Sequence, residues 1–260
     1  MNIVVCVKHV PDAQSDRGFD AADNTTDRDN VDGLLSELDE YAIEEALKLV
    51  EAGEGEVTVL TVGPQQAGDA LKKALQMGAH KGVLVTDEAI AGSCAITTSL
   101  VLAEAIKKIG TPDLVITGMA STDGTMGVLP AMLAERLALP QITLASELSV
   151  SDGQVSARRD GDVASETIVG ALPALVSVTD QINEPRYPSF KGIMAAKKKP
   201  LETWSLADLG VDAGQVGLAN AYTEVVSVSQ RPPREQGEIV TDEGDGGTRL
   251  AEFLAARKFV

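Results

Sequence analysis

The chain has 260 residues, and its 22 Lys and Arg against 39 Asp and Glu give a formal net charge of −17. This acidic balance excludes non-specific nucleic-acid binding, which requires a basic surface. Hydrophobic residues make up 44% of the chain and aromatic residues only 3%. The core must therefore be built from Val, Leu, Ile and Ala, as in parallel sheets buried between helices.

The first part of the chain, up to residue 140, alternates between strand-like and helix-like segments. Short β-branched and apolar runs predict strands at 2–8, 56–63, 81–87 and 113–118. Apolar residues at helical spacing predict helices at 39–52, 67–79, 95–109 and 127–138. Because single helices separate the strands, we expect right-handed crossovers and an α/β fold with a mainly parallel sheet.

The helix predicted at 39–52 carries an apolar stripe from Ile43 to Val50. On the same helix, Glu44 and Lys48 are spaced for a favourable i,i+4 ion pair. We therefore expect one face of this helix to be buried and the other to be charged.

The pattern changes after Pro140, where three or four β-type runs replace the alternation. Asp152-Gly153 is a hairpin signal between two of these runs. The new strands either extend the first sheet or form a second, antiparallel one. No linker rich in Pro, Ser or Gly separates the two halves, so we expect them to share one domain, residues 1–230.

Residues 231–260 are predicted to form a C-terminal arm. Its first part, 231–247, is polar and carries two prolines and four glycines, which is typical of an extended linker. Its last part is predicted to form an amphipathic helix with Leu250, Phe253 and Leu254 on one face. Such a helix packs either on its own domain or on another subunit.

Catalytic and metal-binding motifs are scarce. Neither the two histidines, His9 and His80, nor the two cysteines, Cys6 and Cys94, have metal-type spacing, and the histidines are predicted to be surface or cap residues. Sequence motifs of hydrolases, P-loop NTPases and Rossmann dehydrogenases do not occur. We therefore expect no metal site and no catalytic residue in this chain.

The cysteine content also bears on the compartment. Two cysteines without a secretory signal predict a reducing environment. No apolar run reaches about 18 residues, so no transmembrane helix is expected. We therefore expect a cytoplasmic protein.

The candidate ligand site is the loop that follows the fourth predicted strand. The run VITGMASTDGTMGVLPA places glycines and hydroxyl side chains between strand and helix, namely Gly118, Gly124, Gly127, Ser121, Thr122 and Thr125. Glycines allow backbone N–H groups to turn inward, and a helix N-terminus is partly positive, so phosphate can bind here without Lys or Arg. The alternative is an ordinary glycine-rich connection.

Two further segments would lie at the same edge of the sheet, because ligands bind beyond the carboxyl ends of parallel strands. One is the end of the first strand, with Cys6, Lys8 and His9, and the other is the turn 36–39. Taken alone, Ser36 or Asp39 is explained more simply as the N-cap of a helix.

The segment RYPSFKGIMAAKKKP, residues 186–200, holds one Arg, four Lys and no acidic residue. A short helix with a basic last turn would explain the lysines, because cations are favoured at helix C-termini. It would not explain Phe190, between Ser189 and Lys191. An aromatic residue in a basic segment is typical of an anchor that enters a pocket on a partner protein, with the charges steering the approach.

Several separate stretches occur together in one order: NIVVCVKHVPD, ELDEYAIEEALKL, GPQQAGDALKKALQMGAHKGVLV, GMASTDG and RRDGDVASETIVGALPALVSVTDQINEPRYPSFKGIMAAKKKP. Over essentially its whole length the chain resembles the electron transfer flavoprotein family, in the form of its β subunits. The last stretch is the most specific and is similar to the family's signature followed by its recognition loop, here 184–200. The tail VTDEGDGGTRLAEFLAARKFV is similar to the arm that reaches the partner subunit.

The resemblance implies a heterodimer with an α subunit that mainly holds the redox FAD, while the β subunit closes over the flavin and binds AMP structurally. It implies an electron carrier without acid–base chemistry in this chain. Electrons would come from flavoprotein dehydrogenases of the acyl-CoA type and pass to a membrane quinone reductase. The alternatives are a bifurcating-type subunit with a second FAD in place of AMP, and a stand-alone adenine-nucleotide sensor.

The resemblance also implies roles for individual residues. The AMP-binding positions are Cys6, Ser36, Leu38, Asp39, Val62, Gly118, Ser121, Thr122, Asp123, Gly124, Thr125, Met126 and Gly127. Leu38 also matches a position beside the flavin. The docking positions are Arg186, Tyr187, Phe190, Ile193, Met194 and Lys197, with Phe190 as the hydrophobic anchor. The loop GMASTDGTMG is shorter than in some relatives, so we expect backbone donors to make the phosphate contacts.

Overall fold

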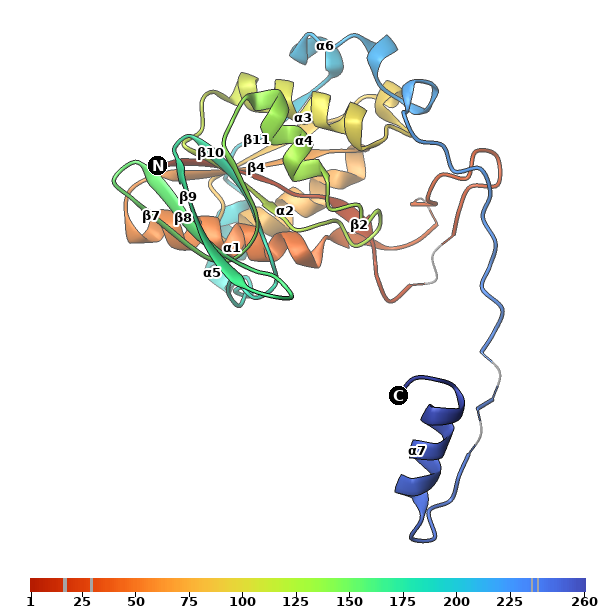
Figure 1. The fold of residues 1–260 in the computed structure, drawn as a ribbon. Helices are drawn as coiled ribbons and strands as arrows, with labels where there is room; N and C mark the ends of the chain where they lie inside the picture. Colours follow the sequence, from red (N-terminus) through yellow and green to blue (C-terminus); the bar gives the residue numbers. More distant parts are fainter. Residues whose placement is uncertain (16–17, 29, 235, 238) are drawn as a thin grey trace. The chain divides into compact units, whose positions relative to one another are not determined.

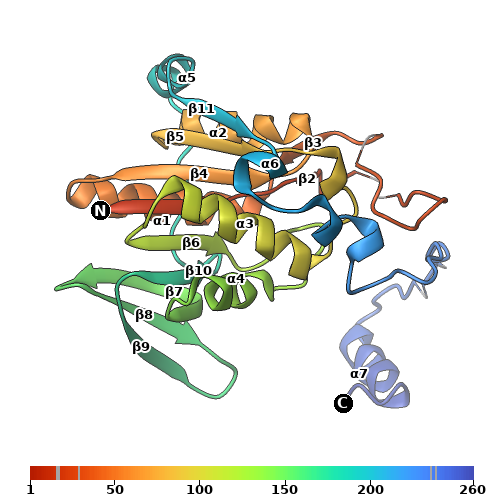
Figure 2. The same cartoon turned by 90° about the horizontal axis from the view of Figure 1, so that it is seen from above.

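A nine-stranded sheet forms the centre of the first unit of the chain, Met1–Val226, in the computed structural model (Figures 1 and 2). The structure describes residues 1–15, 18–28, 30–234, 236–237 and 239–260, and the counts of elements refer to these residues. The second unit, Ser227–Val260, is a linker followed by the helix α7 (Gly246–Ala256). Within this unit, α7 leaves Leu250 and Phe253 exposed.

The described strands lie in one order across the sheet (Figure 2): β11 (Leu201–Trp204), β5 (Lys81–Val85), β4 (Glu56–Val62), β1 (Asn2–Cys6), β6 (Leu114–Gly118), β10 (Ala174–Val178), β7 (Gln141–Ser151), β8 (Gln154–Asp160) and β9 (Ser165–Ala171). All neighbours from β11 to β7 pair in parallel, and β8 and β9 add two antiparallel strands. A separate antiparallel ribbon joins β2 (His9–Pro11) to β3 (Gly33–Leu35). The predicted α/β fold with a mainly parallel sheet is therefore confirmed.

Helices cover both faces of the sheet (Figure 1). One face carries α1 (Glu37–Ala52) and α2 (Gly68–Met77), and α5 (Phe190–Ala196) packs on α2. The other face carries α3 (Ala95–Ile109), α4 (Leu129–Leu137) and α6 (Leu206–Leu209). Short 3₁₀ turns complete the connections: η1 (Gln65–Ala67), η2 (Glu88–Ile90), η3 (Ala213–Gln215) and η4 (Leu218–Asn220).

Two apolar cores lie on the two faces of the sheet. Alternate residues of each strand point to opposite faces, so in β1 Ile3 and Val5 join the core beneath α1 and α2, whereas Val4 joins the core beneath α3 and α4. The stripe predicted on α1 from Ile43 to Val50 is buried. Aliphatic side chains fill both cores, as the low aromatic content requires.

The strands after Pro140 extend the first sheet instead of forming a second one, because β10 inserts between β6 and β7. The predicted hairpin turn joins β7 to β8, and both of its residues have positive φ, 52° at Asp152 and 74° at Gly153. Positive φ at both central residues is what a type I′ hairpin requires. This short turn continues the parallel sheet into an antiparallel extension.

The ion pair predicted between Glu44 and Lys48 is wrong. Lys48 Nζ lies 3.1 Å from Glu45 Oε2, one turn away on the same helix. Glu44 instead binds Arg186, which is 142 residues further along the chain. Tertiary contact overrides the local spacing because the long side chain of Arg186 reaches the partly buried carboxylate.

We predict that Leu71→Ala in α2 destabilises the protein by about 2–5 kcal/mol, because it leaves a cavity in the core. Leu71 is fully buried and packs against Gly82 of β5. The matched control is Val163→Ala, at a side chain that is 99% exposed between β8 and β9. Chemical denaturation should show a change of less than about 0.5 kcal/mol for the control. Equal midpoints for both variants would contradict this packing.

Candidate functional site

Three predicted site positions are the last residues of three neighbouring strands. Cys6 ends β1, Val62 ends β4 and Gly118 ends β6, with β1 in the middle. The strands are parallel, so their last residues share one edge of the sheet. The strand order reverses between β1 and β6, and such a switch point is where open α/β sheets bind ligands.

The turn 36–39 is tied to the end of β1 by two backbone groups. The N–H of Ser36 donates to the carbonyl oxygen of Lys8 at 2.9 Å, and the N–H of Lys8 donates to Asp39 Oδ2 at 2.8 Å. Asp39 lies inside the first turn of α1, so the N-cap interpretation of Asp39 is wrong. Ser36 occupies the N-cap position, but its buried Oγ makes no capping bond and has no partner among the described residues.

Gly118 allows α1 to approach the end of β6. A Cβ at this position would lie 2.6 Å from Asp39 Oδ1 and 2.8 Å from the carbonyl oxygen of Leu38. Contacts this short are not tolerated, and a backbone carbonyl cannot move away freely. Glycine is therefore required here so that the turn 36–39 and the loop after β6 can lie side by side.

Asp39 is buried at this contact, and burial raises its pKa to about 7. Backbone hydrogen bonds from Lys8 and Gly118 and the charge of Lys8 offset only part of this effect. Burial, together with the neighbouring charge of Asp39, raises the pKa of Cys6 to about 12. Cys6 therefore stays a neutral thiol and offers the site a small, weakly polar surface.

The loop after β6 closes as a tight turn. The N–H of Thr125 donates to the carbonyl oxygen of Ser121 at 3.0 Å, and the N–H of Gly124 donates to Ser121 Oγ at 3.3 Å. Thr125 and Gly127 have positive φ, 51° and 65°. The last part of the loop, from Gly124 through Met126 to Val128, is exposed. Thr122 belongs to the same loop and is partly buried.

Asp123 is the electrostatic centre of this loop. Its Oδ1 lies 2.9 Å from Lys8 Nζ and its Oδ2 lies 2.7 Å from Arg28 Nη2. Burial by itself would raise the pKa of Asp123, but the charge of Lys8 and hydrogen bonds from Lys8, Arg28 and Ser121 outweigh it and lower that pKa. The carboxylate therefore stays ionised and acts as an anchor.

Sequence reasoning missed Arg28. It lies in the acidic connection between β2 and β3, 95 residues from Asp123. The only local signal was a cation within the acidic run TDRDN. No periodicity or motif indicates its partner, because the contact exists only after the two loops meet at the sheet edge.

The basic segment is fixed at both ends. Arg186 Nε lies 2.7 Å from Glu44 Oε2, and Arg186 Nη1 lies 2.6 Å from Glu51 Oε1. The hydrogen bonds that Arg186 donates to Glu51 and then to Glu44 raise the pKa of Arg186 above its ordinary value. Lys199 Nζ donates to the carbonyl oxygens of Leu75 and Gly78 at 2.9 and 3.0 Å, at the C-terminal end of α2. The segment is thus attached to two helices.

Between these attachments, α5 presents apolar side chains to solvent. Ser189 caps the helix, since its Oγ accepts a hydrogen bond from the N–H of Gly192 at 3.0 Å. Tyr187 is 92% exposed and Phe190 is 81% exposed. Ile193, Met194 and Lys197 are exposed as well. Arg186 differs from these predicted docking residues because its guanidinium binds acidic residues of α1.

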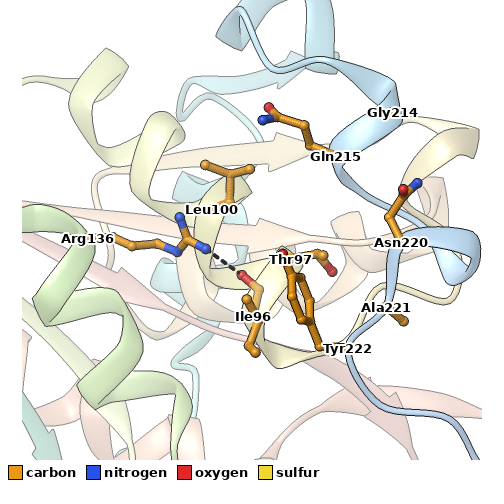
Figure 3. A pocket seen from close by; sticks show the side chains of 9 residues that line it. All are labelled: Ile96, Thr97, Leu100, Arg136, Gly214, Gln215, Asn220, Ala221 and Tyr222. Carbon is orange, nitrogen blue, oxygen red and sulfur yellow. Dashed lines mark hydrogen bonds between the residues drawn. The ribbon is translucent and has the colours of Figure 1, made fainter.

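A separate hollow of about 510 Å³ lies beside α3 and α4 (Figure 3). Its lining comprises Ile96, Thr97, Leu100, Arg136, Gly214, Gln215, Asn220, Ala221 and Tyr222. Arg136 Nη2 donates to the carbonyl oxygen of Ile96 at 3.1 Å, and Arg136 Nε donates to Ser99 Oγ at 2.7 Å. None of the predicted site residues lines this hollow. The strand ends, which bring the predicted residues together, remain the better candidate.

Within the described ranges, no group of three or more His, Cys, Asp or Glu side chains is arranged to hold a metal ion. No helix in the described part of the chain is long and apolar enough to cross a membrane.

The chain is similar to a family model and to several known proteins. The family model described as "Electron transfer flavoprotein domain" matches residues 23–209. "Electron transfer flavoprotein subunit beta" of Mycobacterium leprae is 47% identical over 264 residues, covering 100% of this chain and 99% of the relative. The protein of that name from Mycobacterium tuberculosis is 46% identical with the same coverage. "Caffeyl-CoA reductase-Etf complex subunit CarD" of Acetobacterium woodii is 34% identical over 242 residues, covering 93% of this chain and 92% of the relative.

The raised pKa of Asp39 makes stability depend on pH. Its folded pKa of about 7 exceeds the ordinary value of 3.8, so the folded state holds a proton more tightly than the unfolded state. The contribution of Asp39 to stability is therefore fully present at low pH and is lost as pH rises through the folded pKa. Between about pH 5.5 and about pH 8, wild type should lose about 2 kcal/mol more than Asp39→Asn, which cannot titrate.

Denaturation midpoints at both pH values measure this difference. Asp69→Asn, at an exposed carboxylate of α2, is the matched control and should follow the wild-type profile. If Asp39→Asn follows the wild-type profile as well, the buried carboxyl does not carry the pH dependence.

Proposed function

The chain belongs to the electron transfer flavoprotein family as a β subunit, and from this premise we propose that it binds AMP, shields one side of an FAD and docks electron donors. Proteins of this family are electron carriers, and their β subunits pair with an α subunit. The proposal rests above all on one observation. The ends of β1, β4 and β6, the turn 36–39 and the glycine-bearing loop meet at a single switch point of the sheet.

The residues at this edge fit an adenine nucleotide. Ser36 Oγ is buried without a partner among the described residues, and a buried hydroxyl without a hydrogen bond is costly. A nucleotide would supply that partner. Cys6 and Val62 would offer small apolar surface, and the exposed end of the loop, Met126 and Gly127, would offer backbone N–H groups to the phosphate. Asp39 would hold the turn 36–39 in place.

The FAD would lie mainly on the α subunit and supply the redox chemistry when bound. This chain would contribute shielding from water. Leu38 is half-buried in the turn 36–39, and its carbonyl oxygen packs against Gly118. We propose that Leu38 faces the flavin while its neighbours in the turn hold AMP, so that the nucleotide stabilises the residue beside the flavin.

The donor would dock on the exposed side of α5. Tyr187, Phe190, Ile193 and Met194 form an apolar patch on a segment that is attached to α1 and α2. A pre-organised segment loses little conformational freedom on binding, which favours affinity. Lys197 and its basic neighbours would steer an acidic donor surface. We propose flavoprotein dehydrogenases of the acyl-CoA type as donors and a membrane quinone reductase as acceptor, with the carrier in the cytoplasm.

The C-terminal arm would bind the α subunit. Its helix α7 exposes Leu250 and Phe253 within its own unit, and an amphipathic helix is expected to bury such a face. The linker before it is long enough to let the helix reach a neighbouring chain.

In a second candidate function, the chain is a member of the same family but binds a different ligand. The relative named as a subunit of a caffeyl-CoA reductase-Etf complex is 34% identical to this chain. A bifurcating-type subunit would bind a second FAD where we propose AMP. A stand-alone nucleotide sensor would explain neither the exposed patch of α5 nor the arm.

The ligands can be identified by denaturing the complex isolated from its native host and analysing what is released by mass spectrometry. We expect one AMP and one FAD for each heterodimer with a second subunit of similar size. Two FAD and no AMP would establish the bifurcating-type alternative. A colourless homodimer would exclude the carrier.

We predict that Phe190→Ala slows electron transfer from a dehydrogenase and leaves the flavin content unchanged. Loss of a hydrophobic anchor typically costs on the order of 2 kcal/mol of binding, so the apparent KM for the carrier should rise at least about tenfold. Val163→Ala, at an exposed apolar residue between β8 and β9, is the control and should behave as wild type. A fall in flavin content of Phe190→Ala would mean that Phe190 supports the fold instead.

A further inference from the structure

Two cations from distant parts of the chain share one carboxylate at the candidate nucleotide site. Lys8 follows β1, Arg28 lies between β2 and β3, and Asp123 lies in the loop after β6. Lys8 Nζ and Arg28 Nη2 approach different oxygens of Asp123, at 2.9 and 2.7 Å. Charge-assisted hydrogen bonds of this length fix all three side chains.

The acidic side chain of this cluster is buried, whereas the two basic side chains are partly exposed to solvent. The Asp123 side chain has 0% exposed surface, whereas the side chains of Lys8 and Arg28 are 40% and 39% exposed. Asp123 Oδ1 also accepts the N–H of Gly124 at 2.6 Å. The carboxylate is therefore covered by donors of the protein, and the cluster presents its cations to the outside.

The charge of the cluster is not balanced. Two cations on one carboxylate leave one positive charge, in a chain whose formal net charge is −17. The other carboxyl beside Lys8 is Asp39, which is buried and whose burial raises its pKa to about 7. The Asp39 carboxyl therefore does not face solvent beside the two cations. A cation without a full counter-charge attracts an anionic ligand.

The cluster lies beside the loop and the turn where we propose that the nucleotide binds. A Cβ on Gly124 would lie 3.9 Å from Lys8 Nζ, so the ammonium lies beside the main chain of the loop. The N–H of Ser36 donates to the carbonyl oxygen of Lys8, and the buried Ser36 Oγ has no partner among the described residues. Lys8 therefore links the two features: its carbonyl oxygen binds the residue with the unpartnered hydroxyl, Ser36, and its ammonium belongs to the cation cluster.

We propose that Lys8 and Arg28 bind the phosphate of the adenine nucleotide and that Asp123 holds them in position. This inference rests on the proposed function, because it assigns residues to the phosphate of that ligand. A guanidinium has five N–H donors in a planar fork, and Arg28 uses Nη2 toward Asp123. Its other donors suit the oxygens of a phosphate ester. The backbone N–H groups of the loop would then act together with two cations.

The test compares AMP with adenosine, which differ only in the phosphate. Calorimetric titrations use the heterodimer after its endogenous nucleotide has been removed. Arg28→Gln should weaken AMP binding by about tenfold or more and leave adenosine binding within about twofold, since only AMP carries the charge that Arg28 contacts. Arg28→Lys keeps the charge and should recover part of the AMP affinity.

The matched control is Arg159→Gln. Arg159 is 37% exposed and pairs with one acid, Glu166, in the antiparallel extension of the sheet. This variant should bind AMP and adenosine as wild type does. Flavin content and melting temperature of each heterodimer show whether the variants are folded, and Lys8→Gln provides a second route to the same loss of AMP affinity.

The outcomes distinguish a failure of the phosphate assignment from a failure of the proposed AMP site. If Arg28→Gln weakens AMP and adenosine equally, or neither, Arg28 only shapes the loop and the inference is overturned, while the AMP site stands. If wild type binds neither AMP nor adenosine, the proposed AMP site is itself overturned, and this inference with it. A selective loss of AMP affinity in Arg28→Gln and Lys8→Gln supports the assignment.

Discussion

The contact between Asp39 and the ends of two neighbouring strands holds the candidate site together. Asp39 accepts a hydrogen bond from the N–H of Lys8 and packs against Gly118, where no side chain would fit. A buried carboxyl is costly and is tolerated only when its oxygens are satisfied. The position of α1 is therefore fixed relative to β1 and β6, and the turn 36–39 meets the glycine-bearing loop at one edge of the sheet.

The same electrostatic arrangement recurs at the docking segment. Acidic residues of α1, Glu44 and Glu51, hold Arg186 much as Asp123 holds Lys8 and Arg28. In both places acids fix cations from distant parts of the chain and so position a loop. The consequences differ, since Arg186 is bound to two carboxylates and contributes anchoring, whereas the two cations on Asp123 keep an unbalanced charge. The ratio of cations to carboxylates therefore distinguishes the two clusters.

The apolar patch of α5 depends on these attachments. Phe190 is exposed on a helix of seven residues, which is too short to be stable alone, and Tyr187 is exposed just before that helix. Lys199 at the C-terminal end of α2 and Arg186 on α1 hold the two ends of the segment, and Gly192 lets α5 lie directly against the carbonyl of Gln76. The basic character of the segment is thus explained partly by its anchoring. The structure separates the residues that attach this segment to the helices from the residues that are exposed to solvent.

The sequence alone determined the alternating strands and helices up to residue 140, because periodicity is a local property, but it did not indicate β2, β3, β11 or α6. The helix predicted at 95–109 matches α3, and Asp152-Gly153 makes the predicted hairpin. It also marked Cys6 and Gly118 as strand ends. Only the tertiary structure decided which charges meet: Glu44 binds Arg186 instead of Lys48, and Arg28 reaches Asp123. Helical spacing cannot report partners 142 or 95 residues apart, since their approach depends on how the sheet orders its strands.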